Sequence, residues 1–341
     1  APCWEKYTRE ECCGPDGGQR RASCFDSVFT ARECCAGDGW ARLSPEAEPT
    51  ETAWEDAARW LQGGLLTEPP RGHPAYSRAQ RRWEAGIANA TVLLAEEVLG
   101  HRVQLRVFKR SGPALAKMLE EMREDLYRLR HAAPLPGEST TPVAVDVGAA
   151  VGATAVLLAK LWSGARVVAV EPTPANFRYL LWNLRLNGVA ARVWPLNVAV
   201  GPEPSAAQVF YYSPTYPTWS QACGADCAPS AADDEWRGGW TDWQERFQAE
   251  VLTLAEVLAG LGLPGAVHLL KVDCEGCEWG IFAPLSWGRL RHRVRHVAAE
   301  LHRWALPSSL SAADAGALEA SVRGAVCAHE AEFENLLCST M

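Results

Sequence analysis

Acidic and imidazole side chains follow two apolar stretches in the second half of the chain. Asp273 and Glu275 come directly after one stretch, and Glu300 and His302 close the next. Residues two apart on a strand share a face of the sheet. If the two stretches are neighbouring strands, Asp273, Glu300 and His302 converge at one rim, and Glu275 begins the turn beside them.

A cluster of this kind can orient an acceptor hydroxyl and take its proton. His302 is the strongest candidate for the base, because imidazole titrates near neutral pH. The side chains of Asp273, Glu300 and His302 can instead hold a divalent cation, since carboxylate oxygen and imidazole nitrogen are common metal ligands. We favour proton transfer and assign no metal ligand. The cation, and surface charges without a joint role, are the alternatives.

A glycine turn and a further carboxylate follow two earlier apolar stretches. The turn reads Asp146-Val-Gly148-Ala149-Ala-Val-Gly152. Gly148 allows a tight turn, and Gly152 allows the start of a helix to approach a ligand or a neighbouring strand closely. Glu171 stands where a carboxylate can accept hydrogen bonds from both hydroxyls of a ribose.

This pattern favours a nucleoside ligand that carries no diphosphate. The glycine spacing differs from the G-x-G-x-x-G of dinucleotide-binding turns, and no Lys-Ser or Lys-Thr pair follows it as in a phosphate-binding loop. S-adenosylmethionine is the obvious candidate, because its cationic sulfur suits acidic strand ends better than an anion-binding loop does.

These side chains need a sheet that brings four strand ends together. Short apolar stretches alternate with helical patterns from residue 142 onward, which predicts a parallel α/β sheet. We expect strands over residues 143–147, 166–171, 191–195, 268–273 and 294–301. Ligands of such sheets bind at the carboxyl ends of the strands, so the four polar ends should meet in one cleft.

Four sequence blocks in this order resemble the FkbM-type methyltransferase family over about residues 143 to 302. They read Val-Asp-Val-Gly-Ala-x-x-Gly, Val-Glu-Pro-Thr-Pro-x-Asn-Phe, Leu-Leu-Lys-Val-Asp-x-Glu-Gly-x-Glu and Glu-Leu-His. The resemblance implies a Rossmann-like, doubly wound, mostly parallel sheet of the class I methyltransferase type. It also implies S-adenosylmethionine as cofactor and, typically, a sugar or natural-product hydroxyl as acceptor.

The resemblance assigns residues to the two halves of the reaction. The cofactor side is expected to include Asp146, Gly148, Ala149, Gly152 and Glu171, with Asn197 as an adenine-side contact. The acceptor side is expected to include Asp273, Glu275, Glu278, Glu300 and His302.

We therefore expect an enzyme that methylates a hydroxyl of a carbohydrate or natural product. Two alternatives stay open within the same enzyme class, an N-methyltransferase and a methyltransferase assisted by a divalent metal. A third is a non-catalytic binding protein that uses its cysteine-rich module to recognise a protein or glycan partner.

Composition limits the partners. The chain has 341 residues, of which 48% are hydrophobic and 22% charged, and its formal net charge is −8. This charge argues against nucleic acid and against anionic membranes as partners. No apolar run approaches the roughly 18 residues that a membrane helix needs. The first residue is Ala1, which we interpret as a processed or trimmed start.

Half of the 12 cysteines fall within the first 35 residues, where a Cys-aromatic unit followed by Cys-Cys occurs twice. We expect residues 1–42 to form a disulfide-bonded module, because so short a segment cannot bury a sufficient core. Residues 43–141 are expected to be a linker and a helical segment. Residues 142–341 are expected to form the Rossmann-like domain, and the aromatic- and cysteine-containing insertion at 201–249 a lid or binding wall.

Two cysteines, Cys274 and Cys277, flank the Glu-Gly pair of the third block, and Cys223 and Cys227 lie in the insertion. They can be buried thiols, disulfides that tie the insertion to the sheet, or a four-cysteine zinc site. Paired cysteines favour an oxidising compartment, so we expect a Golgi-like lumen or secretion, with the cytoplasm as the alternative.

Overall fold

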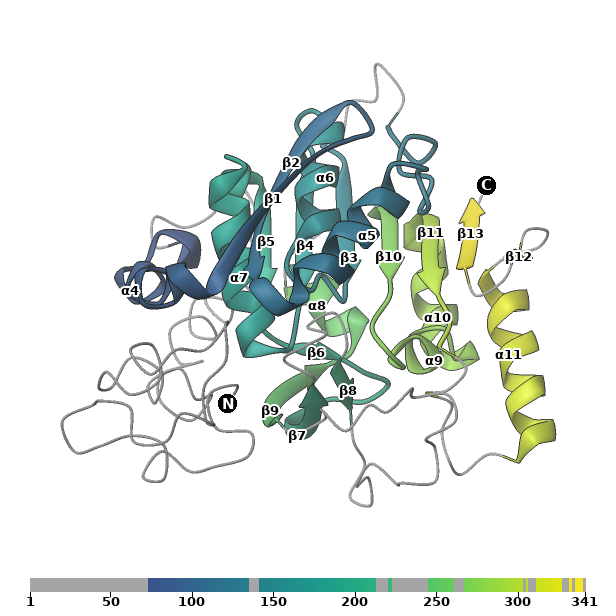
Figure 1. Cartoon of the computed structure of the whole chain (residues 1–341). Helices are drawn as coiled ribbons and strands as arrows, with labels where there is room; N and C mark the ends of the chain where they lie inside the picture. Colours follow the sequence, from purple (N-terminus) through teal and green to yellow (C-terminus); the bar gives the residue numbers. More distant parts are fainter. Residues whose placement is uncertain are drawn as a thin grey trace.

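Figure 1 shows the computed structural model of the chain. The structure describes residues 73–134, 141–212, 220–222, 245–260, 267–302, 305, 311–326, 331–332 and 335–339. The predicted cysteine module at 1–42 lies outside the described residues, as do Cys223 and Cys227. The domain boundaries given above therefore stay predictions.

The described residues form a central sheet of seven strands in the order β12-β13-β11-β10-β3-β4-β5. The strands are β3 (Val143–Val147), β4 (Arg166–Val170), β5 (Val193–Leu196), β10 (Val267–Val272), β11 (Val294–Glu300), β12 (Ala331–Glu332) and β13 (Asn335–Ser339). Pairing is parallel from β11 through to β5, whereas β13 runs antiparallel to both β11 and β12. The predicted mostly parallel, doubly wound sheet is confirmed.

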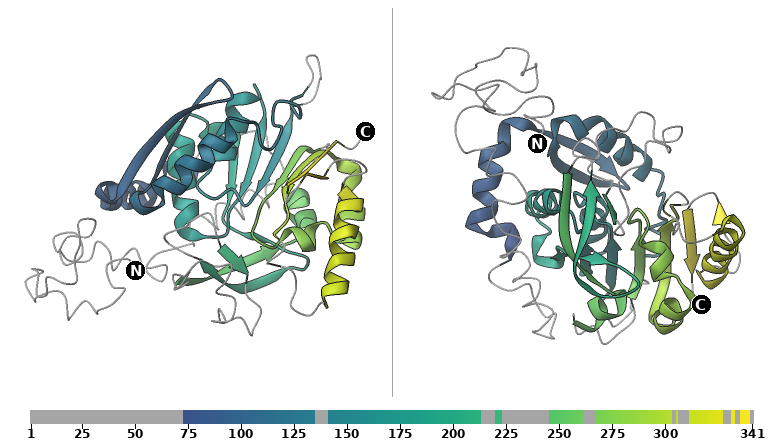
Figure 2. Two further views of the ribbon diagram at one scale, coloured as in Figure 1. Left: turned by 45° about the vertical axis from the view of Figure 1, so that its right-hand side comes forward. Right: turned by 90° about the horizontal axis from the view of Figure 1, so that it is seen from below.

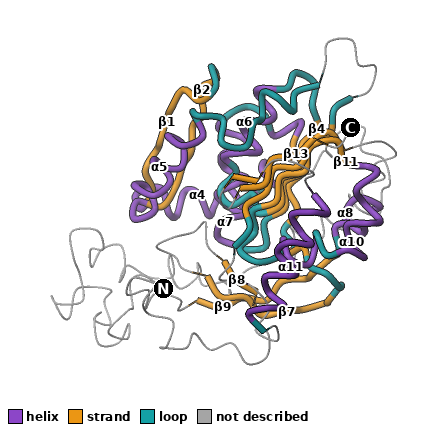
Figure 3. The backbone as a smooth tube through the Cα atoms, turned by 90° about the vertical axis from the view of Figure 1, so that its right-hand side faces the viewer, coloured by secondary structure: helices purple, strands orange, loops and turns teal. Residues whose placement is uncertain are grey.

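Helices cover both faces of this sheet (Figure 3). Every residue of β3 and of β10 is buried, and alternate residues of β3 enter two different hydrophobic cores. Such two-sided burial is what continuous apolar runs predict for parallel strands. One face carries α6 (Ala153–Leu161), α7 (Pro174–Leu186) and α5 (Gly112–Met122). The other face carries α8 (Leu254–Gly260), α9 (Glu278–Ile281), α10 (Pro284–Leu290) and α11 (Ala312–Val326).

The helical segment expected within residues 43–141 is wrong in part. α4 (Arg78–Ile87) ends early, and an antiparallel hairpin follows, made of β1 (Thr91–Val98) and β2 (His101–Phe108). The turn is Leu99–Gly100, both with positive φ, as a two-residue hairpin turn requires. Alternate apolar residues of β2 enter the core shared with α6 and α7. The three- and four-residue spacing of the apolar side chains did not reveal this pairing.

Two asparagines, Asn183 of α7 and Asn187 at its C-terminal cap, bind the free edge of this hairpin. Asn183 accepts a hydrogen bond from the amide of Arg106 at 2.6 Å and donates one to its carbonyl at 3.2 Å. Asn187 does the same for Gln104, at 3.0 and 2.6 Å. The edge of β2 is thereby satisfied by side chains instead of another strand.

A later part of the same segment is helical as expected: α5 ends at Met122, and its residues Leu115 and Leu119 are fully buried. Short 3₁₀ turns connect several elements: η4 (Pro74–Tyr76), η5 (Ala88–Ala90), η6 (Lys109–Ser111), η7 (Ala190–Arg192) and η9 (Arg291–Arg293). Among the described helices, none combines the length and apolar character that crossing a membrane requires.

A second, four-stranded sheet is formed in and around the insertion. It has the order β6-β9-β7-β8, with β6 (Ala199–Val200), β7 (Ser205–Tyr212), β8 (Ser220–Ala222) and β9 (Glu245–Leu252). Figure 2 shows it at one end of the central sheet. Phe210 and Phe247 stack in its core with ring centroids 5.3 Å apart. The other aromatic residues that the sequence singles out in the insertion lie on residues whose side chains are not described.

Candidate active site

A cavity of about 170 Å³ lies at the carboxyl ends of β3, β4 and β10. Gly148 and Glu171 border it on one side, Asp273 and Glu275 on another, and Phe210 of the small sheet contributes a further wall. The insertion therefore forms a wall of the site, as expected. Small-molecule sites commonly measure about 300 to 1,000 Å³, so a nucleoside-sized ligand would extend beyond this cavity.

Gly148 is required because the turns after β3 and β10 contact each other. Its φ is +78°, and a Cβ atom placed there would lie 1.8 Å from the carbonyl oxygen of Asp273. Gly152, with φ +93°, allows a similar approach between α6 and α7, since its Cβ would lie 2.5 Å from Cδ1 of Leu180. Both glycines thus serve contacts between parts of the protein, and Gly148 places the two halves of the site side by side.

Lys271 links the end of β3 to the end of β10 through ion pairs. Its buried Nζ lies 3.1 Å from Oδ1 of Asp146 and 3.5 Å from Oδ2 of Asp273, and it donates a hydrogen bond to the carbonyl of Gly148 at 3.0 Å. Burial lowers the pKa of Lys271, but the two aspartates outweigh this and raise it above its ordinary value. Lys271 is therefore a charged link between the glycine turn and the rim of β10.

Asp146 is fully buried and is not among the residues that line the cavity. Burial raises its pKa above the ordinary value, and Lys271 opposes this effect. The structure thus places Asp146 outside the cavity lining, as a partner of Lys271, and its role toward a cofactor stays a prediction.

Glu171 borders the cavity and is held in place by main-chain amides. Its Oε2 accepts a hydrogen bond from the amide of Ala150 at 2.9 Å, and its Oε1 accepts one from the amide of Thr173 at 2.8 Å. Asn176 donates a longer one to Oε1 at 3.3 Å. Burial raises the pKa of Glu171 against these hydrogen bonds. The carboxylate is fixed between the glycine turn and the start of α7, where we expect the ribose hydroxyls to donate hydrogen bonds to it.

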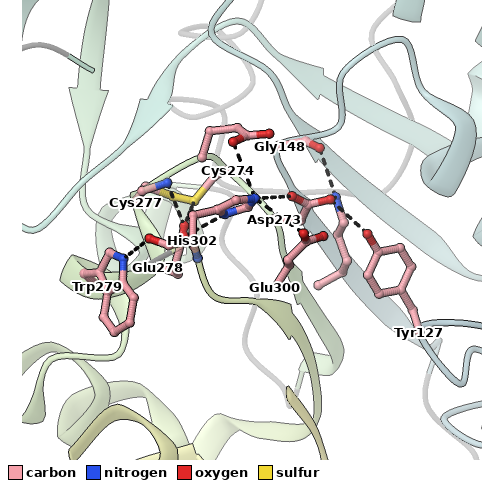
Figure 4. Close-up of polar contacts among 12 residues, drawn as sticks. Tyr127, Gly148, Asp273, Cys274, Cys277, Glu278, Trp279, Glu300 and His302 are labelled. Carbon is pink, nitrogen blue, oxygen red and sulfur yellow. Dashed lines mark hydrogen bonds and ion pairs between the residues drawn. A yellow bond between two sulfur atoms is a disulfide. The ribbon is translucent and has the colours of Figure 1, made fainter. Parts of the chain in front are cut away.

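The acceptor-side residues converge as the sequence predicted (Figure 4). Nε2 of His302 lies 3.4 Å from Oε2 of Glu275, 3.6 Å from Oε1 of Glu300 and 3.8 Å from Oδ1 of Asp273. Donor atoms of Asp273, Glu300 and His302 all lie within 4.8 Å of one another. Asp273 and Glu275 line the cavity, whereas Glu300 and His302 are not among the residues that line it.

Outer partners orient this cluster. Glu278 lies with Oε1 2.8 Å from Nδ1 of His302 and accepts a hydrogen bond from the amide of His302, also at 2.8 Å. The indole of Trp279 donates to the carbonyl of His302 at 2.9 Å. The hydroxyl of Tyr127 donates to Oδ2 of Asp273 at 2.8 Å. His302 and Asp273 therefore each present one fixed atom to the cluster.

Charge in the cluster shifts the pKa values of its members. Burial lowers the pKa of His302, but its contact with Glu278 and the neighbouring carboxylates outweigh this and raise it to about 10. Burial raises the pKa of Glu275 to about 8. Burial also raises the pKa of Asp273, yet Lys271 and His302 bring it below its ordinary value. At neutral pH the imidazole carries a proton, and it can act as a base only after losing it.

Cys274 and Cys277 form a disulfide with each other. The expectations of buried thiols, of a four-cysteine zinc site and of a bridge from these residues to the insertion are therefore wrong for this pair. The bond closes the turn that contains Glu275 and Gly276, both of which have positive φ. It holds Glu275 in a backbone conformation that residues other than glycine rarely adopt.

Four of the six expected cofactor residues do not line the cavity: Asp146, Ala149, Gly152 and Asn197. Asn197 donates hydrogen bonds to the carbonyls of Glu171 and Pro172, at 2.9 and 3.1 Å, so it fixes the turn after β4. Ala149 is buried, and its neighbour Ala150 lines the cavity instead. Tyr127 was missed by the sequence reasoning, because it lies far along the chain from the four blocks and no local pattern marks it.

Comparison with known proteins gives one family. Residues 146–314 match the family model described as the methyltransferase FkbM domain. No curated protein matches the chain.

Similar solved structures include the 16S rRNA N2 G1207 methyltransferase RsmC of T. Thermophilus, solved with AdoMet and guanosine. Its identity is 14% and its TM-score 0.36; the match covers 74% of this chain and 51% of that one. A SAM-dependent methyltransferase from Agrobacterium tumefaciens has 12% identity and a TM-score of 0.30, covering 67% and 58% of the two chains. The match thus spans about half the length of RsmC.

Proposed function

We propose that the FkbM-type methyltransferase domain at residues 146–314 transfers a methyl group from S-adenosylmethionine to a hydroxyl of a carbohydrate or similar small molecule. The family match supports the cofactor. The observation that carries the proposal is the shared cavity, which is lined by Gly148 and Glu171 together with Asp273 and Glu275. A cofactor on one side and an acceptor on the other would meet there.

The residues present fit the cofactor. Glu171 is a fixed carboxylate placed to accept hydrogen bonds from ribose hydroxyls, and the carboxylates of Asp273 and Glu275 favour a nearby positive charge. When bound, S-adenosylmethionine supplies an electrophilic methyl group on a cationic sulfur. Asp273 and Glu275 would then orient the acceptor hydroxyl in line with that methyl group.

Proton removal completes the transfer. As the acceptor oxygen forms its bond to the methyl carbon, the carbon–sulfur bond breaks and its electron pair stays on sulfur. The hydroxyl proton passes to the cluster of Glu275, Glu300, His302 and Asp273. Positioning and a general base are the main requirements of such a step.

The charge of the site favours a small acceptor over a nucleic acid. The chain carries a formal net charge of −8, and three carboxylates surround His302. A phosphate backbone would be repelled by both, whereas a neutral sugar or phenol would not. RsmC is a methyltransferase of 16S rRNA, and the test therefore includes an RNA acceptor.

The test is methyl transfer by the full chain. The protein is incubated with S-adenosylmethionine carrying a labelled methyl group and with separate panels of sugars, phenols, amines and RNA. We expect labelled methyl ethers from a hydroxylated acceptor, identified by mass spectrometry. Transfer to amines or RNA alone would overturn the acceptor class. Absence of calorimetric binding of both S-adenosylmethionine and its demethylated product would overturn the whole proposal.

We further propose that the protein works in an oxidising compartment, such as a Golgi-like lumen, or after secretion. The disulfide between Cys274 and Cys277 supports this, because such bonds persist mainly outside the reducing cytosol. Mass spectrometry of protein alkylated without reduction, from its native source, tests the proposal. Recovery of both cysteines in alkylated form would contradict it.

A further inference from the structure

We propose that Asp273, Glu300 and His302 bind a divalent cation, for which Mn²⁺ is the suitable probe. The inference deepens the proposed function, on which it rests, by assigning what activates the acceptor hydroxyl. It is carried by the positions of the donor atoms and by the outer partners that orient them.

The donor atoms have the spacing of ligands around one ion. Nε2 of His302 lies 3.6 Å from Oε1 of Glu300 and 3.8 Å from Oδ1 of Asp273. Two ligands on a cation at about 2.1 to 2.2 Å lie about 3.0 to 3.6 Å apart, depending on coordination geometry. All three donor atoms lie within 4.8 Å of one another, so the side chains would move closer together to share one coordination sphere.

Residues around the three proposed ligands orient the donor atoms of Asp273 and His302 toward each other. Tyr127 and Lys271 both lie against Oδ2 of Asp273, at 2.8 and 3.5 Å, which leaves Oδ1 facing the cluster. Glu278 lies against Nδ1 of His302 at 2.8 Å and so directs Nε2 to the same place. A carboxylate behind a histidine is the usual outer partner of a metal ligand, because it fixes the ring and its tautomer.

The backbone of His302 is held as firmly as its ring. Its amide donates to Glu278, and its carbonyl accepts from the indole of Trp279 at 2.9 Å. The imidazole therefore has little freedom to turn away from Asp273 and Glu300. This preorganisation is what a binding site needs, because the ordering of the ligands is done before the ion arrives.

The carboxylates around the proposed site would attract a cation. Three carboxylates, those of Asp273, Glu275 and Glu300, lie within 3.8 Å of the same imidazole nitrogen. Lys271 is shared between Asp273 and Asp146. In the metal-free protein the proton on His302 supplies the positive charge of the cluster, and a bound cation would replace that proton. Carboxylates suit Mg²⁺, Ca²⁺ and Mn²⁺, and an imidazole favours the transition metals, so Mn²⁺ satisfies both kinds of ligand.

An ion held in part by Asp273 would lie at the cavity wall, where an acceptor hydroxyl would coordinate it. A bound divalent cation lowers the pKa of a coordinated hydroxyl. The acceptor oxygen would lose its proton to the carboxylate of Glu275 and attack the methyl carbon, while the carbon–sulfur electron pair remains on sulfur. In this arrangement His302 is a ligand and Glu275 takes the proton.

The test begins with binding, independent of turnover. The full chain is freed of metal with a chelator, dialysed and titrated with Mn²⁺ while the free ion is followed by electron paramagnetic resonance. We expect one equivalent to bind, and His302→Gln or Asp273→Asn to weaken it at least 10-fold. Glu300→Gln, at a half-exposed position, serves as a third variant if the buried substitutions reduce folding. Glu124→Gln, at an exposed site outside the cluster, is the matched control and should bind normally.

The outcomes separate the metal from the methyl transfer. Equal Mn²⁺ binding by the wild type and all three site variants, or no binding at millimolar Mn²⁺, overturns the metal site. Full turnover after exhaustive chelation also overturns it, and leaves the proposed function intact. Binding of Mn²⁺ that the site variants lose, without transfer to any hydroxylated acceptor, supports the site and contradicts the proposed function.

Discussion

The hydroxyl of Tyr127 donates a hydrogen bond of 2.8 Å to Oδ2 of Asp273, although 146 positions separate the two residues. Tyr127 follows α5 on the segment that precedes the sheet, and Asp273 ends β10 at the cavity. The contact therefore ties the segment after α5 to the end of β10 at the cavity, where we propose that the acceptor binds. The same segment shares its hydrophobic core with one face of the sheet.

Tyr127→Phe removes this hydrogen bond and little else, because the ring stays in place. Hydrogen bonds to charged groups contribute about 1.5 to 3 kcal/mol. We expect kcat to fall about 10-fold or more while the affinity for S-adenosylmethionine changes less than 2-fold. Steady-state kinetics and calorimetry on the same preparation check this. A matching loss of cofactor affinity would contradict the acceptor-side position.

Gly148→Ala should disrupt both halves of the site. Its φ of +78° strains any residue with a Cβ, and that Cβ would meet the carbonyl oxygen of Asp273 at 1.8 Å. Gly164→Ala is the matched control, because Gly164 has φ +76° and nothing within 4 Å of the added atom. We expect about 1 to 2 kcal/mol of destabilisation for the control and about 3 kcal/mol or more for Gly148→Ala, measured by denaturant unfolding. Equal losses would show that contact between the two turns is unimportant.

Glu171→Gln should act on the cofactor and spare the acceptor. The substitution keeps the shape but removes the charge that accepts hydrogen bonds from Ala150 and Thr173. Loss of charged hydrogen bonds predicts about 10- to 100-fold weaker binding of S-adenosylmethionine. The KM for the acceptor should stay within 2-fold. Calorimetry with the demethylated cofactor gives the affinity without turnover, and an unchanged value would remove Glu171 from the cofactor site.

Stability of the metal-free protein should fall as pH rises. Folding raises the pKa of Glu275 from 4.5 to about 8 and that of His302 from 6.5 to about 10. The folded state then holds more protons than the unfolded state, so the free energy of unfolding decreases with pH. Both groups contribute to this decrease between about pH 6.5 and 8, and His302 alone contributes to it from there to about pH 10. Urea unfolding of chelator-treated protein at several pH values checks this.

His302→Gln provides the control for that pH series. It removes the imidazole, so the decline between about pH 8 and 10 should become flatter than in the wild type. An identical slope in both proteins would show that His302 titrates as it does in the unfolded chain.

The disulfide between Cys274 and Cys277 should matter for turnover more than for cofactor binding. It closes the turn that holds Glu275 at φ +58°. The double variant Cys274→Ser/Cys277→Ser frees that turn, and we expect kcat to fall several-fold with cofactor affinity nearly unchanged. The single variants, each leaving one free thiol, are compared under non-reducing conditions. Wild-type kcat in the double variant would show that the bond does not position Glu275.

Local sequence determined the central sheet and its polar rims. β3 and β10 are buried on both faces, as the mostly apolar composition of these five- and six-residue strands predicts. The glycine at 148 and the carboxylates after β4, β10 and β11 lie at strand ends, so their meeting at one edge follows once the strands are parallel. The fold class and the convergence of Asp273, Glu300 and His302 could therefore be predicted.

Tertiary structure decided what depends on partners distant in sequence. Residues 91–98 carry apolar side chains at intervals compatible with a helix, and pairing with β2 made them a strand. Asn197 donates hydrogen bonds to the carbonyls of Glu171 and Pro172, and Tyr127 donates one to Asp273. Tertiary packing brings each of these donors to its acceptor. Periodicity records which face of an element is buried. It does not record which distant group each polar atom meets, and that pairing sets the chemistry of this site.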